Sequence, residues 1–227
     1  AIFDPREVPI VSRDSHMPAI QQALLTPDAL RLRFTQEKHW EVEVTDENRA
    51  ALAREGSVRA GRGDALTPAA VLIPLIMYEN ELKILLTQRT AHLHDHPGQI
   101  SFPGGRSDPQ DGSAIETALR EAEEELNIPP ARVKVIGVAD TYYSGSGYSI
   151  APVVGIIPPD LELQPNPQEV EDWFEVPLAF LLDPANSIKK ETNWNGQQRS
   201  YYDMQWGERR IWGVTAGIIA NLVRRLA

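Results

Sequence analysis

The sequence predicts an α/β protein whose mixed β-sheet is sandwiched between helices. Two observations support this fold class. Strand-like runs rich in β-branched and aliphatic residues recur from residue 68 onward, and two strong helical patterns are interleaved with them. The 227 residues are enough for one large domain, or for one domain with a sizeable extension. No apolar run approaches the roughly 18 residues that span a membrane, so we expect no membrane partner.

The first 65 residues have a weaker pattern than the rest of the chain. Prolines interrupt the opening stretch, and the Gly- and Arg-rich segment Gly56–Asp64 is typical of a linker. We therefore divide the chain into an N-terminal extension, residues 1–65, and a main domain, residues 66–227. Short elements are expected within the extension: helices at Met17–Leu25 and Asp28–Phe34, and a strand at Trp40–Val44.

The main domain opens with a predicted β-hairpin. Ala69–Met77 and Leu82–Gln88 have strand composition, and Glu79-Asn80 supplies the turn between them. A segment punctuated by Gly and Pro, Asp95–Gly105, leads from the hairpin to the first strong helix. Further strands are expected at Val133–Tyr143, Ile150–Ile157, Val170–Val176 and Arg199–Gln205, and a closing helix at Val214–Leu226.

The strongest helical pattern covers Ser113–Leu126, and Pro129-Pro130 ends it. At about 100° per residue its apolar side chains form one stripe, and Glu121, Glu124 and Glu125 lie together on a flank of that stripe. Three like charges repel each other there, and a hard divalent cation such as Mg²⁺ or Mn²⁺ would reverse the repulsion. Taken alone, a glutamate-rich flank is typical of a solvated helix face.

Composition narrows the classes of function. The net charge of −10 argues against a broad nucleic-acid surface, because phosphate contacts need clustered Lys and Arg. A small phosphate-containing substrate would need a few placed cationic side chains or a bound metal. The chain has no cysteine, which excludes disulfides and thiolate ligands and is compatible with the cytoplasmic location that we expect.

A signature surrounds the glutamate helix. The stretch Gly104–Ile128, GGRSDPQDGSAIETALREAEEELNI, resembles the Nudix box, a glycine and a loop followed by Arg-Glu and, after two residues, Glu-Glu. This resemblance implies a Nudix-type α/β/α sandwich with a mixed β-sheet and Mg²⁺- or Mn²⁺-dependent hydrolysis of a pyrophosphate bond. The matching positions are Arg120, Glu121, Ala122, Glu124, Glu125 and Ile128.

The box departs from the common pattern in three ways. Its loop is one residue longer, and the usual loop glutamate is replaced by Gly112 with Asp111 beside it. Asn127 stands where a glycine normally ends the helix, a mild change because Asn also tolerates the left-handed conformation. The Arg-Glu and Glu-Glu pairs are intact.

A second stretch indicates a branch of the family. Leu85–Gly105, LLTQRTAHLHDHPGQISFPGG, resembles the signature of coenzyme A pyrophosphatases, with departures at Thr90 and at His94, where a basic residue is usual. The resemblance implies cleavage of coenzyme A, or its oxidised or acylated forms, into 3′,5′-ADP and a phosphopantetheine product. The matching positions are Leu85, Leu86, Thr87, Arg89, Gly98, Phe102, Pro103, Gly104 and Gly105.

These resemblances imply roles for particular residues. Metal binding and catalysis are assigned to three carboxylates, and Arg120 is expected to orient one of them by a charge-assisted hydrogen bond. Glu169 is a candidate additional acid. The metal ligands are Glu121, Glu124, Glu125 and Gly105, and the substrate-binding residues are Arg89, His96 and Gly104.

Several alternatives stay open at this point. The substrate could be another nucleoside diphosphate derivative, such as ADP-ribose or a dinucleotide, and the fold could be a non-catalytic nucleotide sensor. The alternating His92, His94 and His96 raise a weaker zinc hypothesis. Tyrosines in the loop 141–149 could stack on a base, although a place in a turn or the core is favoured: Tyr142, Tyr143 and Tyr148. We expect a homodimer, with residues 1–65 serving dimerisation or covering the substrate cleft.

Overall fold

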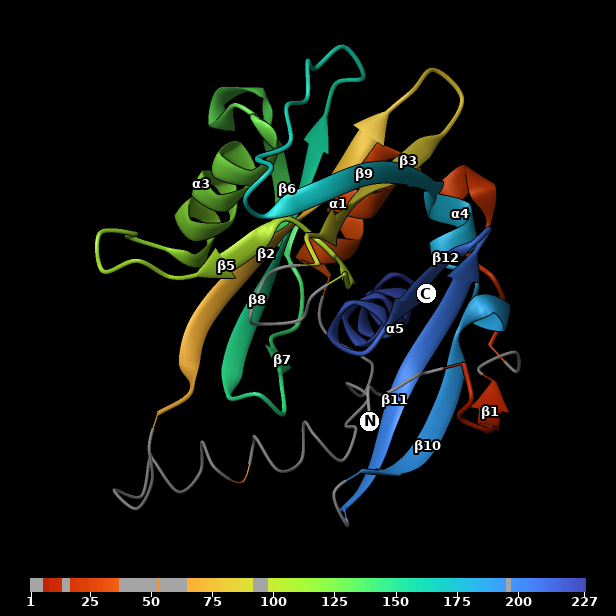
Figure 1. The fold of residues 1–227 in the computed structure, drawn as a ribbon. Coiled ribbons are helices and arrows are strands. Elements are labelled where there is room, and N and C mark those ends of the chain that lie inside the picture. The colour runs from red at the N-terminus through yellow and green to blue at the C-terminus, as the bar shows by residue number, and fades with distance from the viewer. Residues whose placement is uncertain (1–5, 14–16, 37–52, 54–64, 92–97, 195–196) are drawn as a thin grey trace.

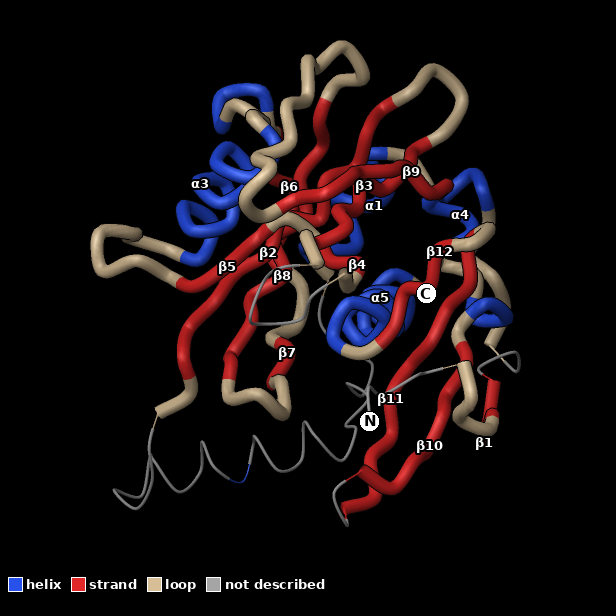
Figure 2. Tube along the Cα trace, in the orientation of Figure 1, coloured by secondary structure: helices blue, strands red, loops and turns tan. Residues whose placement is uncertain are grey.

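The computed structural model describes residues 6–13, 17–36, 53, 65–91, 98–194 and 197–227. These residues form two β-sheets with helices between and around them (Figure 1). Helix α3 (Ala114–Leu126) covers one face of the larger sheet, and α5 (Val214–Leu226) lies against the other. The smaller sheet packs on the far side of α5, so that strands flank this helix on two sides (Figure 2).

The larger sheet is mixed, as the sequence predicts, and it holds eight strands within the described chain. Strand β2 pairs in parallel with β8 and antiparallel with β3 and β5, so it lies at the centre. Strand β9 extends the sheet beyond β3. The strands are β2 (Thr67–Met77), β3 (Leu82–Arg89), β4 (Ile100–Ser101), β5 (Gly104–Arg106), β6 (Lys134–Val138), β7 (Tyr142–Tyr143), β8 (Tyr148–Ile157) and β9 (Val170–Pro177).

The smaller sheet is antiparallel, in the order β1-β10-β11-β12. Its strands are β1 (Ile10–Arg13), β10 (Ile188–Trp194), β11 (Gln197–Trp206) and β12 (Arg209–Trp212). Because α5 lies between two sheets, apolar side chains are buried around most of its circumference, Ile219 and Leu222 among them. Short helical segments complete the fold: Gln22–Leu24, α1 (Pro27–Thr35), Pro130–Arg132, α4 (Leu178–Leu181) and Pro184–Asn186.

The described parts of the N-terminal extension pack on the rest of the chain. Strand β1 pairs with β10, and α1 contacts β6 and α5. The ring of Phe34 lies so close to Gly137 that a Cβ there would be 2.4 Å from it. The role predicted for the extension stays a prediction. No described helix has both the length and the apolar content to cross a bilayer.

Most predicted elements are confirmed, including the hairpin, in which Tyr78 N donates to Glu81 O, 3.0 Å away. Two predictions differ. The helix predicted at Met17–Leu25 is only the 3₁₀ turn Gln22–Leu24, because this stretch buries only Leu25 and packing therefore does little to stabilise a longer helix. The strand predicted at Val133–Tyr143 is two strands, separated where Asp140 turns to pair with Arg225. Strands β1, β4, β5, β10 and β12 are not among the predicted strands, and Trp40–Val44 and Gly56–Asp64 lie outside the described residues.

Candidate active site

Helix α3 begins and ends where its sequence allows. The side chain of Ser113 accepts a hydrogen bond from Glu116 N at 3.2 Å, and Glu116 reaches back to Gly112 N at 2.9 Å, which satisfies two donors at the start of the helix. Asn127 takes the left-handed conformation, with φ 58°, and so does what the usual glycine would do. Ala118, Ala122 and Leu126 face the core, which leaves the glutamate flank beside the edge of the sheet.

The two glycines of β5 permit the helix and the sheet to meet closely. A Cβ at Gly105 would be 2.6 Å from the carboxylate of Glu121, and a Cβ at Gly104 would be 2.5 Å from Ala70 O. The backbone of β5 therefore lies directly against the glutamate flank. Any larger residue at Gly105 must displace Glu121.

Arg120 organises this flank. It donates to Glu121 Oε1 at 2.9 Å and to Glu124 Oε2 at 3.1 Å. Its remaining donors hold both oxygens of Asp111, at 3.1 and 3.0 Å, and the carbonyl of Arg106. A bidentate guanidinium–carboxylate pair of this kind fixes orientation as well as charge. The loop to the helix is thereby tied to the helix itself.

Asp111 is next to Gly112, the position at which the common signature has a glutamate, and its carboxylate binds Arg120. The hydrogen bonds from Arg120, followed by that from the backbone of Asp108, hold the pKa of Asp111 well below its usual range. Thr117 also donates to its Oδ2, at 2.9 Å. The carboxylate is thus ionised and fully engaged. Asp111 precedes the usual glutamate position by one residue, and the longer loop allows its carboxylate to reach Arg120.

The three glutamates have different surroundings. The side chain of Glu124 is 54% exposed, whereas Glu121 is largely buried and Glu125 is only 2% exposed. Burial raises the pKa of Glu121, with Arg120 opposing the shift. Burial, followed by the charge of Glu169, raises the pKa of Glu125 to about 8, although Arg89 and the backbone N–H of Gly104 oppose it. In the absence of a cation, Glu125 holds a proton at neutral pH.

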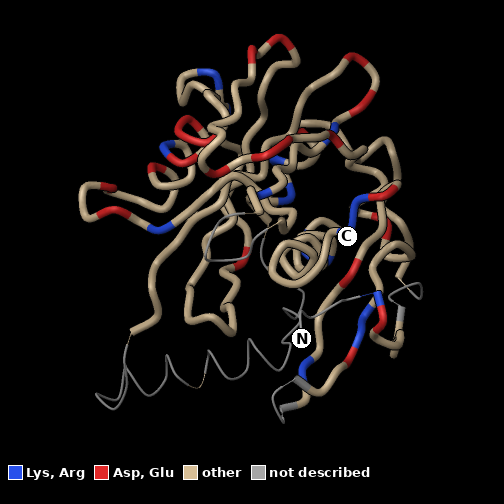
Figure 3. The backbone as a smooth tube through the Cα atoms, viewed as in Figure 1, with Lys and Arg blue, Asp and Glu red and all other residues tan. Residues whose placement is uncertain are grey.

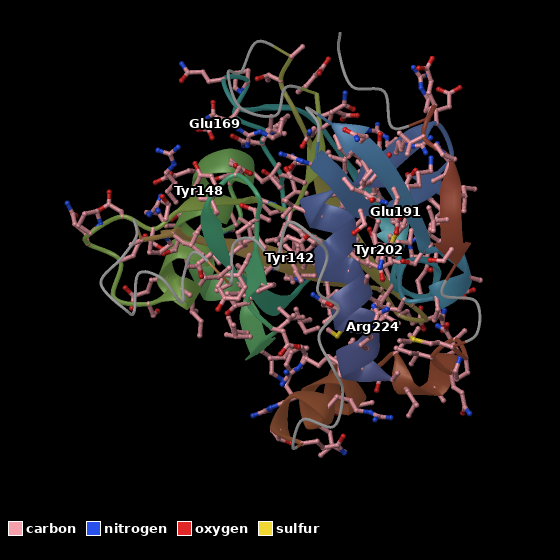
Figure 4. All side chains as sticks on the ribbon, turned by 90° about the horizontal axis from the view of Figure 1, so that it is seen from below. Tyr142, Tyr148, Glu169, Glu191, Tyr202 and Arg224 are labelled. Atoms are coloured by element: carbon pink, nitrogen blue, oxygen red, sulfur yellow. The ribbon has the colours of Figure 1, made fainter. Side chains whose placement is uncertain are left out.

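Glu169 lies in the same site, on the loop that enters β9 (Figure 4). Its charge raises the pKa of both Glu121 and Glu125, so the three carboxylates face one region. Two contacts place it: its carbonyl accepts from Thr90 N at 3.0 Å, and its N–H donates to Asn166 O at 3.0 Å. Asn166 N in turn donates to Glu125 O, which ties this loop to the end of α3.

Arg89 is the cation that faces this acidic region from the sheet. It is the last residue of β3, and its charge acts on Glu125. Within the described residues its Nε atom is buried and has no hydrogen-bond partner. A buried donor without a partner costs free energy unless a ligand satisfies it.

The donor set suits a hard divalent cation, although the described residues hold no ready-made cluster of three acidic or histidine ligands. Mg²⁺ and Mn²⁺ prefer carboxylate oxygens as ligands. The charges of Glu121, Glu125 and Glu169 act on one another, so these carboxylates are the candidates to hold such a cation. The carboxylate of Glu124 accepts a hydrogen bond from Arg120 and is separate from these three. Acidic residues recur along α3 and the loop that precedes it (red in Figure 3).

The remaining candidates divide clearly. Tyr142 is buried against α5, where its ring approaches Gly217, and it belongs to the core (Figure 4). Tyr148 is half-buried and accepts a hydrogen bond from Arg106 Nε at 2.9 Å. His92, His94 and His96 lie outside the described residues, so the zinc hypothesis and the substrate role of His96 stay predictions.

We expect Asp111→Asn to lower hydrolysis about tenfold, a size typical of losing a group that orients a metal ligand. Asparagine keeps the shape but removes the charge that holds Arg120, so Arg120 would shift and release Glu121. Steady-state turnover against Mg²⁺ concentration measures this. Asp108→Asn is the control, because the side chain of Asp108 lies in the same loop and accepts from Gln110 N rather than from Arg120. Equal activity of the two variants would contradict the role of Asp111.

Comparisons with known proteins show which family the chain resembles. A family model described as the NUDIX domain matches residues 66–196. The chain is 45% identical to an uncharacterized Nudix hydrolase, NudL, of Photorhabdus laumondii over 158 residues, which covers 70% of this chain and 84% of that protein. It is 46% identical to NudL of Escherichia coli K12 over 159 residues, covering 70% and 82%.

The fold has more distant likenesses among solved structures. A C. elegans Ap4A hydrolase complex has a TM-score of 0.44 and 21% identity, and the match covers 52% of this chain and 85% of that one. A MutT/nudix family protein from Enterococcus faecalis has a TM-score of 0.44 and 14% identity, covering 79% and 69%. Likenesses this modest carry no argument about substrate.

Proposed function

Since this chain belongs to the Nudix hydrolase family, we propose that it is a Mg²⁺- or Mn²⁺-dependent pyrophosphohydrolase of coenzyme A or its oxidised or acylated derivatives. The products would be 3′,5′-ADP and a 4′-phosphopantetheine compound. The position of Arg89 supports this proposal most directly. This residue belongs to the stretch that resembles the coenzyme A pyrophosphatase signature, its charge acts on Glu125, and its buried Nε has no hydrogen-bond partner among the described residues.

The charges explain why a diphosphate would fit. The described carboxylates of the site repel an anion. The guanidinium of Arg120 is engaged by Glu121, Glu124 and Asp111, whereas that of Arg89 acts on Glu125 by its charge alone. A guanidinium can donate to phosphate oxygens in a fixed geometry, which satisfies its free Nε. Gly104 leaves its N–H close to the carboxylate of Glu125. Arg89, Gly104 and, from the sequence, His96 are the proposed substrate contacts.

The carboxylates would hold the metal. Glu121, Glu125 and the backbone of Gly105 are the proposed ligands, with Glu169 as an additional acid and Glu124 as a supporting group or base. A bound metal lowers the pKa of water and neutralises charge that develops on a phosphate. Arg120 keeps Glu121 and Glu124 in place through its two hydrogen bonds. Glu121, Glu124, Glu125 and Arg120 are therefore the residues to which we assign catalysis.

A second substrate class has a specific observation in its favour. His94 replaces a basic residue of the branch signature, and coenzyme A carries a 3′-phosphate that such a residue would suit. A nucleoside diphosphate derivative without this phosphate, such as ADP-ribose or a dinucleotide, is therefore the alternative. A non-catalytic sensor is disfavoured, because Arg120, Glu121, Glu124 and Glu125 are all present and Arg120 holds Glu121 and Glu124 by hydrogen bonds.

A substrate panel tests the proposal. We expect coenzyme A to be cleaved with a higher kcat/KM than 3′-dephospho-coenzyme A, ADP-ribose or a diadenosine polyphosphate, in the presence of Mg²⁺ or Mn²⁺ and not in EDTA. Mass spectrometry of the products shows which bond breaks. We expect Glu121→Gln to lose activity on every substrate. Preference for ADP-ribose would select the alternative, and full activity of Glu121→Gln would reject catalysis by this site.

A further inference from the structure

A side chain from the smaller sheet reaches the strands that carry the site. Arg209, the first residue of β12, donates through Nη2 to Asp172 Oδ2 at 2.5 Å and through Nη1 to Gln88 Oε1 at 3.3 Å. Its guanidinium also lies over the ring of Phe174, 4.1 Å from the centroid. One planar group therefore holds β3 and β9 together from outside their sheet.

The contact falls at an irregularity in the sheet. Gln88 is paired with Asp172, but the next residue of β3, Arg89, is paired with Val170, so Glu171 is an extra residue on β9. A bulge of this kind leaves one residue outside the ladder and re-aims the side chains next to it. Backbone pairing alone determines their direction less strictly there than in a regular ladder.

Because side chains alternate along a strand, the contact of Arg209 with Gln88 and Asp172 can affect the nearby residues that face the site. Successive residues of a strand point to opposite faces, so Gln88 faces Arg209 while Arg89 faces the carboxylates of the site. On β9, Asp172 is held by Arg209 just beyond the bulge, and Glu169 enters the site just before it. Arg209 thus holds Gln88, which is next to Arg89, and Asp172, which lies three residues after Glu169.

We propose that Arg209 is a positioning residue that holds Arg89 and Glu169 in their places through Gln88 and Asp172. The inference rests on the proposed function, because it takes Arg89 to be the phosphate contact. Arg209 lies outside residues 66–196, the part that the family model matches. The smaller sheet thereby helps to position residues of the site, besides packing on α5.

The contact suits positioning better than stabilisation of the fold. The side chains of Arg209 and Asp172 are 31% and 50% exposed, and ion pairs with this much exposure contribute little to folding. A forked group that joins two strands does restrict their relative movement. Loss of Arg209 should therefore change the site more than it changes the melting temperature.

Binding of inorganic pyrophosphate in EDTA, measured by calorimetry, tests the proposal without metal or turnover. Arg209→Met keeps an apolar side chain and removes the guanidinium. We expect it to weaken pyrophosphate binding about tenfold and to raise KM for coenzyme A more than it lowers kcat, with an almost unchanged melting temperature. Arg209→Lys should recover part of the affinity, because it keeps the charge opposite Asp172. Arg132→Met, which removes the exposed pair with Asp160, is the matched control and should bind like the wild type.

A double mutant decides whether Arg209 acts through Arg89. Pyrophosphate affinity of Arg89→Met with Arg209→Met should equal that of Arg89→Met alone, since coupled residues are not additive. Additive losses, or wild-type affinity in Arg209→Met, would overturn the proposal. Absence of pyrophosphate binding by the wild type would also overturn it, because Arg89 would then not be an anion contact. A wild type that binds pyrophosphate but does not cleave coenzyme A would reject the proposed substrate and leave the role of Arg209 intact.

Discussion

Replacing Glu125 with glutamine is expected to stabilise the metal-free protein at pH 8.5 while lowering hydrolysis by about 10² to 10³-fold. Loss of one preorganised charged group in a site typically has an effect of this size on turnover. The gain in stability has a separate cause. Glu125 is 2% exposed, and ionisation of a buried carboxylate next to Glu169 is unfavourable. Glutamine keeps the shape and never ionises.

The pKa values determine the pH range of this effect. Glu125 ionises at about pH 8 in the folded protein, whereas its ordinary value is 4.5. Between these values the folded state binds more protons than the unfolded state, so stability falls as pH rises. The penalty is absent below pH 4.5 and complete above pH 8, where it is on the order of a few kcal/mol. The advantage of Glu125→Gln should therefore grow from pH 5 to pH 8.5.

Urea unfolding in EDTA at pH 5 and pH 8.5 measures the effect. Glu123→Gln is the matched control, because Glu123 belongs to the same helix and is exposed. It should change neither stability nor turnover appreciably. Adding Mg²⁺ at pH 8.5 should stabilise the wild type and not Glu125→Gln. A wild type whose metal-free stability is the same at both pH values would contradict the buried, protonated state of Glu125.

The fold was predictable to the extent that each element carries its own apolar pattern. Strands β2 and β8 are nearly continuous runs of apolar residues, and α3 has a clear apolar stripe, so the sequence located them within a few residues. Strand β10, IKKETNW, has no such pattern. Its Lys190 is buried in an ion pair with Asp203 of β11, at 2.9 Å, and a buried charge of this kind resembles a solvated one in a sequence.

The residue types of the site could be predicted from the sequence, whereas the burial and the hydrogen-bond partners of those residues could not. The pairs Arg120-Glu121 and Glu124-Glu125 locate the glutamate flank in the sequence. The sequence does not distinguish the surroundings of Glu124 from those of Glu125. Their burial differs because Glu125 faces the loop before β9 and Glu124 faces solvent. The partner of Arg120 in the loop follows from a longer connection that no local pattern encodes.

Contacts between distant segments lie further beyond the reach of sequence. Arg209 is separated from Gln88 by 121 residues, and no motif surrounds it. Glu169 was a candidate from its place before a strand, and its approach to Glu125 depends on the hydrogen bond between Asn166 and the end of α3. Such contacts arise from the packing of whole elements, so only the folded structure shows them.

Alanine at the two glycines of β5 should separate the stability of the fold from the activity of the site. At Gly104 the new methyl group would be 2.5 Å from Ala70 O and 2.6 Å from Val71 Cα, and backbone in a central strand has little room to move. We expect Gly104→Ala to lower the free energy of unfolding by about 1–3 kcal/mol or more, the usual cost of overpacking. At Gly105 the methyl group would be 2.6 Å from the carboxylate of Glu121, the end of a flexible side chain.

Gly105→Ala should therefore fold with nearly wild-type stability and lose about 10²-fold in turnover, because Glu121 must leave its place beside β5 and a displacement of about 1 Å can cost that much. Thermal unfolding and steady-state kinetics, measured on both variants, give the comparison. Gly112→Ala is the control, since its methyl group would meet only the movable end of Glu116, at 3.2 Å. If Gly105→Ala kept full activity with its stability unchanged, the position of Glu121 against β5 would not matter for hydrolysis, and the assignment of Glu121 and Gly105 to the metal site would fail.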